Sequence, residues 1–320
     1  MVSRDEVIAA FRLVLGREPE SDAVVDKLLP VPDWKNLREV FMSSGEFRNK
    51  MTSHDYMGRL KEYMEAPPNS VDVKISDAQF GQLLEHVHSS WETLGRDQPH
   101  FSVLTNPIFL PEHIDANVDS FYESGEENVQ TMETAALRSG KTLSSDWTCF
   151  ELGCGVGRVT ARLATRFRKV IACDISKPHL DLASTHLANR NIRNVNFVQL
   201  ASLATLEALD PFDVFYSVIV LQHNPPPVIF RILQAILHKV RVGGGVYFQV
   251  PVASLGYRFS IADYLATIDD RRGTMEMHVL PQVHLFKLLE DNGFRILDIQ
   301  RDNSTGPDFH SLTIFAERKG

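Results

Sequence analysis

The sequence contains little cysteine, with three residues among 320, and none of them belongs to a C-x-x-C pair. This spacing argues against a structural zinc site. Cys149, Cys154 and Cys173 are expected to be small buried side chains in a reducing compartment rather than halves of disulfides. Such cysteines are typical of a cytoplasmic protein, and we predict no bound metal.

Long apolar runs are also missing. The most apolar stretch, residues 214–221, is too short to cross a bilayer, and Asp5 and Glu6 stand where a signal peptide needs an apolar segment. Positive charge is scarce as well, since 33 Lys and Arg residues face 41 Asp and Glu residues, for a net charge of −8. Short basic clusters such as Arg271–Arg272 make no continuous stripe. Neither nucleic acid nor a membrane is therefore an expected partner.

Helical periodicity marks the amino-terminal part of the chain. Ser3 followed by Glu6 forms a capping-box pattern at the start of a helix. Apolar residues then recur at helical spacing, namely Val7, Ile8, Phe11, Val14 and Leu15. A second helix is expected from Ser21, and a third from Asp33 after two prolines. We predict a small all-helical module over residues 1–52.

Two segments of this module, FRLVLGREP at residues 11–19 and FMSSGEF at residues 41–47, resemble the small helical modules called DUF4214. Those modules are similar to phycobilisome-linker repeats, and in bacteria they often precede sugar-modifying enzymes. The resemblance implies docking to a protein partner rather than chemistry. A plain three-helix cap on the next domain is the alternative that the residues leave open.

After a linker over residues 53–76 and a helical lid segment over residues 77–145, apolar runs alternate with helical patterns. The runs typical of strands cover residues 148–152, 169–173, 195–200, 214–221 and 246–250. The helical patterns between them cover residues 159–168, 179–188 and 228–240. Two late runs, 294–300 and 311–316, fit an antiparallel pair. The alternation predicts an α/β fold over residues 146–320, a Rossmann-like, doubly wound, mostly parallel seven-stranded sheet with an antiparallel C-terminal strand.

A glycine-rich turn of sequence ELGCGVGR, ending at Arg158, lies between a predicted strand and a predicted helix. Gly153 and Gly155 allow tight backbone angles and let a ligand approach the main chain, while Gly157 permits close contact between helix and strand. Asp174 ends the next strand about twenty residues on, where a carboxylate can accept hydrogen bonds from ribose hydroxyls. Arg158 stands where the dinucleotide fingerprint has its last glycine. The pattern predicts a nucleotide-type cofactor site that departs from the dinucleotide kind.

The ELGCGVGR turn resembles the first motif of class I S-adenosylmethionine-dependent methyltransferases, and the resemblance extends over residues 146–319. Residues 213–223 are similar to the fourth strand of that family and the loop beyond it. Residues 239–245 match the glycine turn that precedes its fifth strand. The resemblance implies S-adenosylmethionine as cofactor and methyl transfer as activity.

By that resemblance the three glycines of the turn line the methionine part of the cofactor, and Glu151 anchors the loop or the amino group. Asp174 would bind the ribose and Ile175 would pack on adenine. Many members carry an acid after the third strand for the adenine amino group, but here Ser202 or local backbone stands in its place. The full set of expected cofactor-binding residues is Tyr122, Glu151, Gly153, Gly155, Gly157, Arg158, Asp174, Ile175, Ser202, Leu203, Ser217 and Gln222.

Methyl transfer chiefly needs an acceptor held in line with the methyl group, and an acceptor hydroxyl also benefits from a base. His223 lies just past the predicted fourth strand, where open α/β sheets bind ligands, and is our first candidate for a general base or an acceptor-orienting group. A local cap on the three prolines that follow is the alternative. A long insertion over residues 251–281 brings Glu276 and His278 as catalytic candidates over the pocket, or as packing of a small helical cap. Tyr122 is a lid candidate, or else a core residue.

These observations favour a cytoplasmic methyltransferase that acts on oxygen or nitrogen of a small or carbohydrate-like acceptor, for example in surface-polysaccharide or glycan modification. The carbohydrate preference follows by analogy from the linker-like module and the long cap. One rival is a methyltransferase fold without activity that serves as a binding scaffold. Another is a nicotinamide oxidoreductase, against which Arg158 and the second glycine turn at Gly243 argue.

Overall fold

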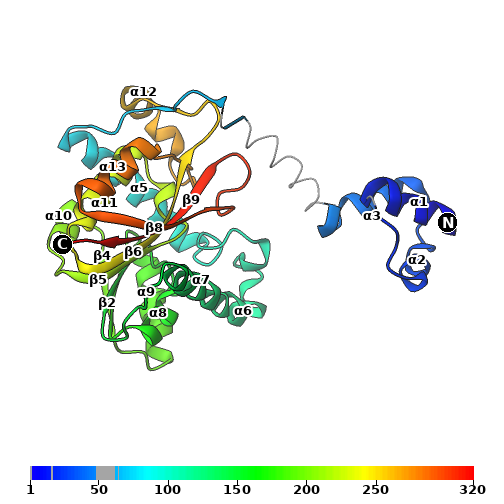
Figure 1. Ribbon diagram of the computed structural model, residues 1–320, viewed down its shortest axis with the longest axis horizontal. Helices are drawn as coiled ribbons and strands as arrows, with labels where there is room; N and C mark the ends of the chain where they lie inside the picture. The colour runs from blue at the N-terminus through cyan, green and yellow to red at the C-terminus, as the bar shows by residue number, and fades with distance from the viewer. Residues whose placement is uncertain (1, 16, 48–61, 64) are drawn as a thin grey trace. The chain divides into compact units, whose positions relative to one another are not determined.

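The structure is a computed structural model, and it describes residues 2–15, 17–47, 62–63 and 65–320. The chain divides into two compact units, Met1–Ala66 and Pro67–Gly320, which are described separately (Figure 1). Much of the predicted linker, residues 53–61 and 64, lies outside the described residues. No helix in the described ranges is long and apolar enough to cross a membrane.

The described part of the first unit is helical. Its elements are α1 (Arg4–Ala10), a π-helical turn (Phe11–Leu15), α2 (Asp22–Leu28) and α3 (Trp34–Met42). The predicted capping box is confirmed, because the Ser3 hydroxyl accepts from the Glu6 N–H and the Glu6 carboxylate accepts from the Ser3 N–H. Phe11 and Phe41 meet edge to face, with ring centroids 4.8 Å apart. The apolar residues that recur at helical spacing thus gather into one small core.

The second unit is built on a seven-stranded sheet in the order β4-β3-β2-β5-β6-β9-β8. Its strands are β2 (Thr148–Leu152), β3 (Lys169–Asp174), β4 (Val195–Gln199), β5 (Phe212–Ser217), β6 (Val240–Ala253), β8 (Phe294–Asp302) and β9 (His310–Arg318). Within this sheet β9 runs antiparallel to both neighbours, and the other pairs are parallel. The predicted α/β fold with a mostly parallel sheet and one antiparallel strand is confirmed. The strand order reverses at β2, and sheets of this kind bind ligands beyond the carboxyl ends at such a point.

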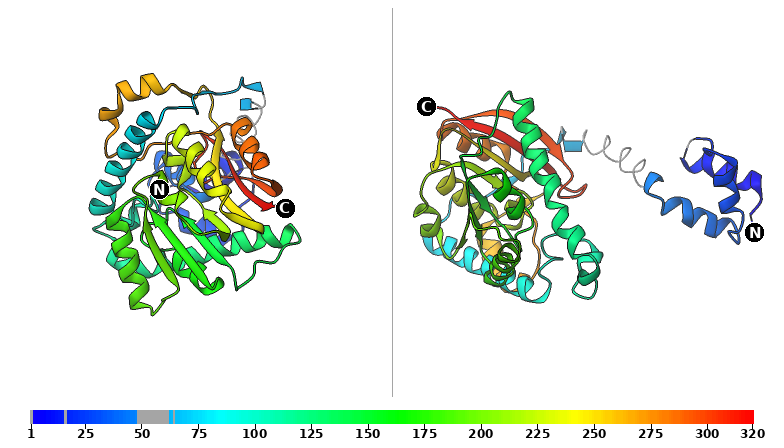
Figure 2. Two further views of the ribbon diagram at one scale, coloured as in Figure 1. Left: turned by 90° about the vertical axis from the view of Figure 1, so that its left-hand side faces the viewer. Right: turned by 90° about the horizontal axis from the view of Figure 1, so that it is seen from below.

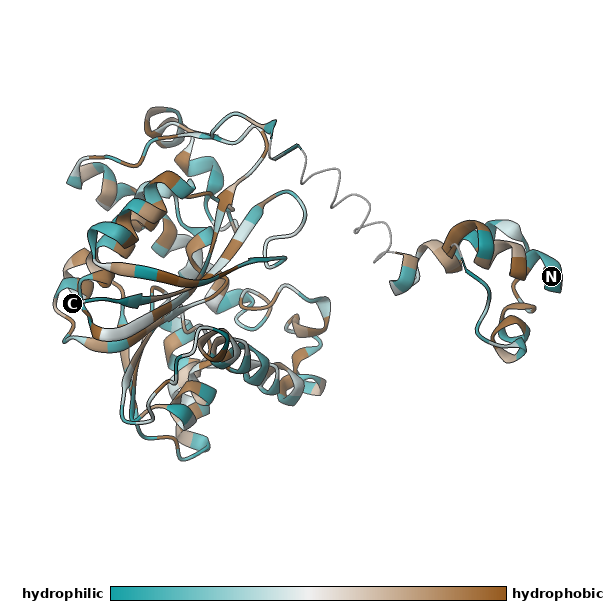
Figure 3. Cartoon of the chain, viewed as in Figure 1, coloured by the Kyte–Doolittle hydropathy of each residue, from teal (hydrophilic) through white to brown (hydrophobic). Residues whose placement is uncertain are grey.

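Helices cover both faces of this sheet, as Figures 1 and 2 show. The helices of this unit are α5 (Asp77–Asp97), α6 (Val118–Glu123), α7 (Gly125–Arg138), α8 (Thr160–Arg166), α9 (Lys177–Asn189), α10 (Leu203–Glu207), α11 (Pro226–Leu237), α12 (Ile261–Ala266) and α13 (Gln282–Asp291). Successive residues of β2 enter different cores, since Phe150 packs with α11 and Cys149 packs with α7 and α8. Because both faces are covered at the centre of the sheet, the central strands β2 and β5 are buried along most of their length, and brown, hydrophobic segments mark the middle of the sheet in Figure 3.

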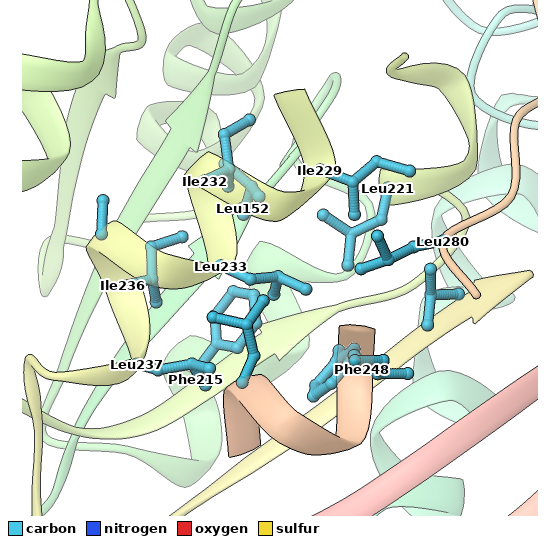
Figure 4. Close-up of a cluster of buried hydrophobic side chains, with 14 of the residues drawn as sticks. Leu152, Phe215, Leu221, Ile229, Ile232, Leu233, Ile236, Leu237, Phe248 and Leu280 are labelled. Carbon is cyan, nitrogen blue, oxygen red and sulfur yellow. The ribbon is translucent and has the colours of Figure 1, made fainter. Parts of the chain in front are cut away.

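The core between α11 and the sheet is shown in Figure 4. Ile229, Leu233 and Ile236 of α11 are completely buried, as are Phe215 of β5 and Phe248 of β6. Truncating a side chain of this size in such a core costs about 2–5 kcal/mol. This packing fixes β5, from whose carboxyl end the next loop starts.

The predicted strand over residues 214–221 is too long at its carboxyl end. Strand β5 stops at Ser217, and a 3-10 turn covers Leu221–His223. Between them Ile219 has a φ of +60°, a left-handed conformation that is costly for a β-branched residue. Residues 218–220 are apolar because they line a cavity, and not because they pair in the sheet.

The glycine run at residues 243–245, predicted as a turn before a strand, lies inside β6 instead. Gly243 has a φ of +84°, and the register between β5 and β6 shifts at this point. A Cβ on Gly244 would lie 2.3 Å from the Asp213 carbonyl oxygen. The glycines therefore form an irregularity through which the strand continues.

The end of the predicted linker is attached to the second unit. Strand β1 (Ser70–Val71) pairs in parallel with β7 (Arg258–Phe259) in the insertion over residues 251–281. The Asn69 amide donates to the carbonyl oxygens of Ser254 at 2.7 Å and Tyr257 at 3.0 Å. Residues 69–71 are thus part of the folded cap region rather than a linker.

Candidate active site

A cavity lies at the carboxyl ends of β2, β3 and β5, where the topology places a ligand. It holds about 920 Å³ of space not filled by protein atoms, part of it open to solvent. Helix α5, residues 102–103, the glycine turn and the segment after β5 form its walls. Of the predicted site residues, those that line it are Glu151, Gly153, Gly155, Arg158, Asp174, Ile175 and His223.

The glycine turn is bonded directly to the acid at the end of β3. Gly153 has a φ of +75° and Gly155 a φ of +53°, angles that favour glycine. The Gly155 N–H donates to Asp174 Oδ2 at 2.8 Å, and the Ser176 N–H donates to Oδ1 at 2.9 Å. Because a carboxylate oxygen has two lone pairs, Asp174 can hold the turn and still accept from ligand hydroxyls.

Glu151 is a buried carboxylate in the cavity wall. It is 2% exposed, and no described residue provides a hydrogen-bond partner for its Oε2. Burial raises the pKa of Glu151 to about 7, against the opposing effects of the nearby Thr160 hydroxyl and of the Arg158 charge. A carboxylate of this kind gains strongly from a cationic group placed beside it.

Arg158 connects the cavity wall to the segment that precedes the sheet. Its guanidinium donates to the Ser124 hydroxyl at 3.1 Å and to the Asn128 side-chain oxygen at 2.8 Å. It is 6% exposed, and burial lowers its pKa. No described residue accepts from its Nε–H. Arg158 therefore fixes the start of α7 beside the cavity and keeps one donor open.

His223 lies in the 3-10 turn after β5 and lines the cavity. Its Nδ1 is 2.9 Å from the main-chain oxygen of Glu276, and its ring meets Trp91 edge to face at 5.3 Å. Burial lowers the pKa of His223 to about 4. The imidazole is therefore neutral near pH 7, as a hydrogen-bond acceptor or general base must be.

Glu276 and His278, predicted either as catalytic residues over the pocket or as packing of a small helical cap, do not line this cavity. The Glu276 carboxylate accepts from Tyr264 Oη and from His86 Nε2, both at 2.8 Å. His278 is 5% exposed and its Nδ1 lies 2.8 Å from Tyr257 Oη. Both side chains are engaged within the cap because their partners come from α5 and from the insertion itself. The described residues contain no group of three or more side chains suited to hold a metal ion.

Tyr122 is buried away from the cavity, in an apolar cluster with Phe121 and Val156. Its ring stacks on His186 of α9 at a centroid distance of 3.4 Å. The alternative of a core residue therefore describes Tyr122, and Val103 lines the cavity instead. A Cβ on Gly155 would lie 2.7 Å from Val103 Cγ2, so this residue covers the glycine turn.

Three further predicted cofactor residues have other neighbours. Ser202 and Leu203 line an outer groove against α5 instead of the cavity, and Leu200 takes the wall position after β4. The buried Ser217 hydroxyl donates to the Leu152 carbonyl oxygen at 3.1 Å and so joins β5 to β2. Short polar side chains in a turn or strand end cannot be placed from sequence, because backbone partners compete with a ligand for them.

Gly157 and Gln222 also act on the fold around the cavity and do not line it. A Cβ on Gly157 would lie 2.9 Å from Leu187 Cδ1 and 3.2 Å from Ala183 Cβ. The close contact that Gly157 permits is therefore with α9, and not with a strand. Gln222 is 2% exposed, and its carbonyl oxygen accepts from the His278 N–H at 2.7 Å.

Several residues of the cavity wall escaped prediction, namely Val87, Trp91, Ser102, Val103, Cys154, His179, Leu200, Tyr216, Val218, Ile219, Val220, Asn224 and Ile232. Trp91 is on α5, about sixty positions before the glycine turn, and no motif marks it. Ser102 accepts or donates at 2.9 Å to His179 of α9, a contact that only the fold creates. Two signals were available, since Cys154 lies inside the glycine turn and Val218, Ile219 and Val220 belong to the apolar run after residue 213.

In comparison with known protein families, residues 150–244 match a family model described as a methyltransferase domain. No curated protein matches the chain. Among solved structures the chain is similar to magnesium protoporphyrin IX methyltransferase from Synechocystis PCC 6803 with bound SAM (15% identity, 78% of this chain, 100% of that chain, TM-score 0.49). It is also similar to a [4+2]-cyclase (14% identity, 78% of this chain, 99% of that chain, TM-score 0.48). A third similar structure is an S-adenosylmethionine-dependent methyltransferase from Clostridium acetobutylicum (14% identity, 62% of this chain, 92% of that chain, TM-score 0.44).

The domain match contains the glycine turn, Asp174 and His223, which line one cavity. Residues 150–244 thus match a methyltransferase domain that contains these cavity residues, and S-adenosylmethionine is the cofactor that the sequence resemblance implies. The residues present fit this cofactor. Glu151 offers a buried carboxylate oxygen without a described partner to an ammonium group, and Asp174 offers lone pairs to ribose hydroxyls.

Proposed function

We propose that this enzyme methylates oxygen or nitrogen of a small acceptor, and that a carbohydrate-like molecule or glycan is the preferred class. The observation that carries the proposal is that Glu151, Asp174 and His223 line a single cavity. A small acceptor is favoured because α5 and residues 102–103 also line that cavity, which limits its size. The carbohydrate class rests on the resemblance of residues 11–19 and 41–47 to modules that often precede sugar-modifying enzymes.

The donor's methionine end is assigned to Glu151, whose carboxylate would pair with the α-ammonium. Its ribose hydroxyls are assigned to Asp174, and its adenine to the apolar wall that Ile175 and Leu200 provide. Gly153 and Gly155 leave the main chain accessible beside these groups. The bound donor supplies a methyl group on a positively charged sulfur, which a nucleophile takes in one displacement. The protein's contribution to that step is chiefly position.

His223 is assigned to the acceptor. Near pH 7 it is neutral, so one ring nitrogen can accept a hydrogen bond from an acceptor hydroxyl or amine. This contact would orient the nucleophile and take up its proton as the bond to the methyl group forms. Because Trp91 contacts the ring edge to face, the imidazole is held in one orientation.

We also propose a division of labour along the chain. Residues 1–52 serve as a DUF4214-like docking module for a protein partner, and residues 146–320 carry the chemistry under a lid drawn from residues 77–145. The three free cysteines are all buried, which suits a reducing, cytoplasmic compartment.

The test is calorimetry of the full chain with S-adenosylmethionine, S-adenosylhomocysteine and NAD, followed by transfer of a labelled methyl group to a panel of sugars, glycans and small amines. Binding of the two adenosyl ligands and labelling of a small acceptor are the expected results. Binding of NAD alone would contradict the cofactor assignment. Donor binding without labelling of any acceptor, also in the presence of lysate metabolites, would favour a scaffold over an enzyme.

A further inference from the structure

The hydrogen bond between His223 and Glu276 decides which nitrogen of the imidazole carries hydrogen. His223 Nδ1 lies 2.9 Å from the main-chain oxygen of Glu276. A carbonyl oxygen only accepts, so Nδ1 must be the donor. In a neutral ring the remaining lone pair is then on Nε2, which lies 3.3 Å from the side-chain nitrogen of Gln222, a donor. Both contacts agree on one tautomer.

Glu276 has no regular secondary structure to hold that carbonyl in place, since residues 274–281 are neither helix nor strand. Its side chain supplies the anchor. Oε1 accepts from His86 Nε2 and Tyr264 Oη, both at 2.8 Å, and Oε2 accepts from an Arg271 nitrogen at 3.3 Å. Burial alone would raise the pKa of Glu276, but contacts with His278, His86 and Tyr264 lower it to about 2. The carboxylate is therefore charged at any working pH.

The same stretch of cap is fixed a second time, two residues later. The His278 N–H donates to the Gln222 carbonyl oxygen at 2.7 Å, directly before His223 in the chain. The His278 ring lies between Tyr257 Oη, 2.8 Å from Nδ1, and Glu276 Oε2, 3.4 Å from Nε2. The turn that carries His223 and the cap that carries Glu276 thus hold each other through main-chain atoms on both sides.

We propose that Glu276 is a positioning residue whose anchored carboxylate keeps its own main-chain oxygen on His223 Nδ1–H, so that the ring's one lone pair is on Nε2, where an acceptor hydroxyl or amine takes the place of the Gln222 amide as hydrogen-bond donor. The catalytic consequence rests on the proposed role of His223, whereas the tautomer itself does not. Glu276 lines no part of the cavity and acts only through His223. The groups that face the ring are Trp91 from α5, Gln222 from its own turn, and Glu276 and His278 from the cap.

The first experiment is a long-range proton–nitrogen NMR spectrum of the full chain, labelled on histidine and free of ligand. It separates the two tautomers, and His223→Gln identifies the signal. The wild type should show His223 with hydrogen on Nδ1. Glu276→Ala should give a tautomer mixture, lower kcat roughly 10- to 100-fold, and change the donor Kd less than about threefold. Glu276→Gln keeps an oxygen acceptor but loses the charge. Its tautomer ratio and its kcat should lie between those of the wild type and those of Glu276→Ala.

Asp269→Asn is the matched control, because Asp269 lies in the same insertion but is exposed and pairs only with Arg272 among the described residues. It should change neither the tautomer nor kcat. Hydrogen on Nε2 in the wild type would overturn the inference, as would Glu276→Ala with the wild-type tautomer and kcat. If Glu276→Ala fails to fold, Tyr264→Phe removes one donor and must shift the tautomer in the same direction. A wild type that binds no donor would overturn the proposed function alone, since the tautomer is measured without ligand.

Discussion

The backbone N–H of Gly155 donates to the Asp174 carboxylate at 2.8 Å, which joins the turn after β2 to the acid at the end of β3. The pairing of the two strands makes this contact possible, because Leu152 lies opposite Cys173 in the parallel register. The Gly153 N–H also donates to the Cys173 carbonyl oxygen, at 2.7 Å. The residues proposed to recognise the donor's ribose and its methionine end thus belong to one hydrogen-bonded unit.

Replacement of Asp174 by alanine should weaken S-adenosylmethionine roughly 100-fold. Two hydrogen bonds from ribose hydroxyls to a charged acceptor are lost, each worth about 1.5–3 kcal/mol. The Gly155 N–H in the glycine turn also loses the carboxylate to which it donates. Calorimetry of the variant measures the effect. Asp181→Ala on the exposed face of α9, where the carboxylate is paired with Lys177, is the control and should leave the affinity unchanged. Equal affinities for the Asp174 variant and the wild type would refute the ribose assignment.

Donor affinity should fall in acid because of Glu151. Burial raises the pKa of this carboxyl to about 7 in the empty protein, and only the carboxylate attracts an ammonium group. Below pH 7 the donor must therefore displace a proton, and Kd should rise about tenfold for each pH unit. Calorimetry between pH 5.5 and pH 8, values chosen as roughly one and a half units below and one above that pKa, tests this. Glu151→Gln should bind weakly with no such slope, and an equal slope in that variant would contradict the assignment.

The same carboxyl should make the empty protein less stable as pH rises from about 4.5 to about 7. Its pKa is raised on folding from 4.5, so the folded state holds a proton that the unfolded state has already released in this window. The free energy of unfolding then decreases with pH. Urea denaturation of wild type and Glu151→Gln across this range isolates the contribution, because the amide does not titrate. Saturating donor should remove the difference in slope.

The sequence predicted the sheet well where burial alone determines it. Strand β2 was predicted with its observed ends. Its apolar run is bounded by polar residues on one side and by the glycine turn on the other, and such a run forms a buried strand in a parallel sheet whose faces are both covered. The run after Phe212 was overextended because residues 218–220 are apolar for another reason, the wall of the cavity. Hydrophobicity measures burial and does not report what a side chain is buried against.

The site was predictable only as far as a local motif reaches. Glu151 and Asp174 follow from the strand–turn–helix pattern, because their positions are fixed by neighbouring parallel strands. Trp91 and Val103 reach the cavity from a helix and a loop distant in sequence. The Glu276 side chain is bonded within the cap and does not line the cavity. Its partners come from α5, from α12 and from the turn that follows α12. Such contacts depend on tertiary packing, which no spacing in the chain encodes.

Gly157→Ala should destabilise the protein by about 2–4 kcal/mol. The new methyl group would lie within 2.9 Å of Leu187, and a φ of +85° adds the cost of a left-handed alanine. Gly243→Ala is the matched control, since its φ of +84° is nearly the same and nothing lies within 4 Å of the added Cβ. It should cost only about 1 kcal/mol. Denaturant unfolding compares the two, and equal losses would show that contact with α9 is not what Gly157 provides.

His223→Ala should reduce kcat about 100-fold while the donor Kd stays within about threefold, because the imidazole is assigned to the acceptor and not to the donor. The pH dependence of the wild type gives an independent check. Burial lowers the pKa of His223 to about 4, so the base remains unprotonated down to about pH 5. At saturating donor and acceptor, kcat should therefore be insensitive to this group between pH 5 and pH 8, whereas kcat/KM for the donor falls in acid through Glu151. A drop of the wild-type kcat with a midpoint near the ordinary histidine pKa of about 6.5 would mean that the ring is more hydrated than its surroundings imply. An unchanged kcat in His223→Ala would remove His223 from the reaction.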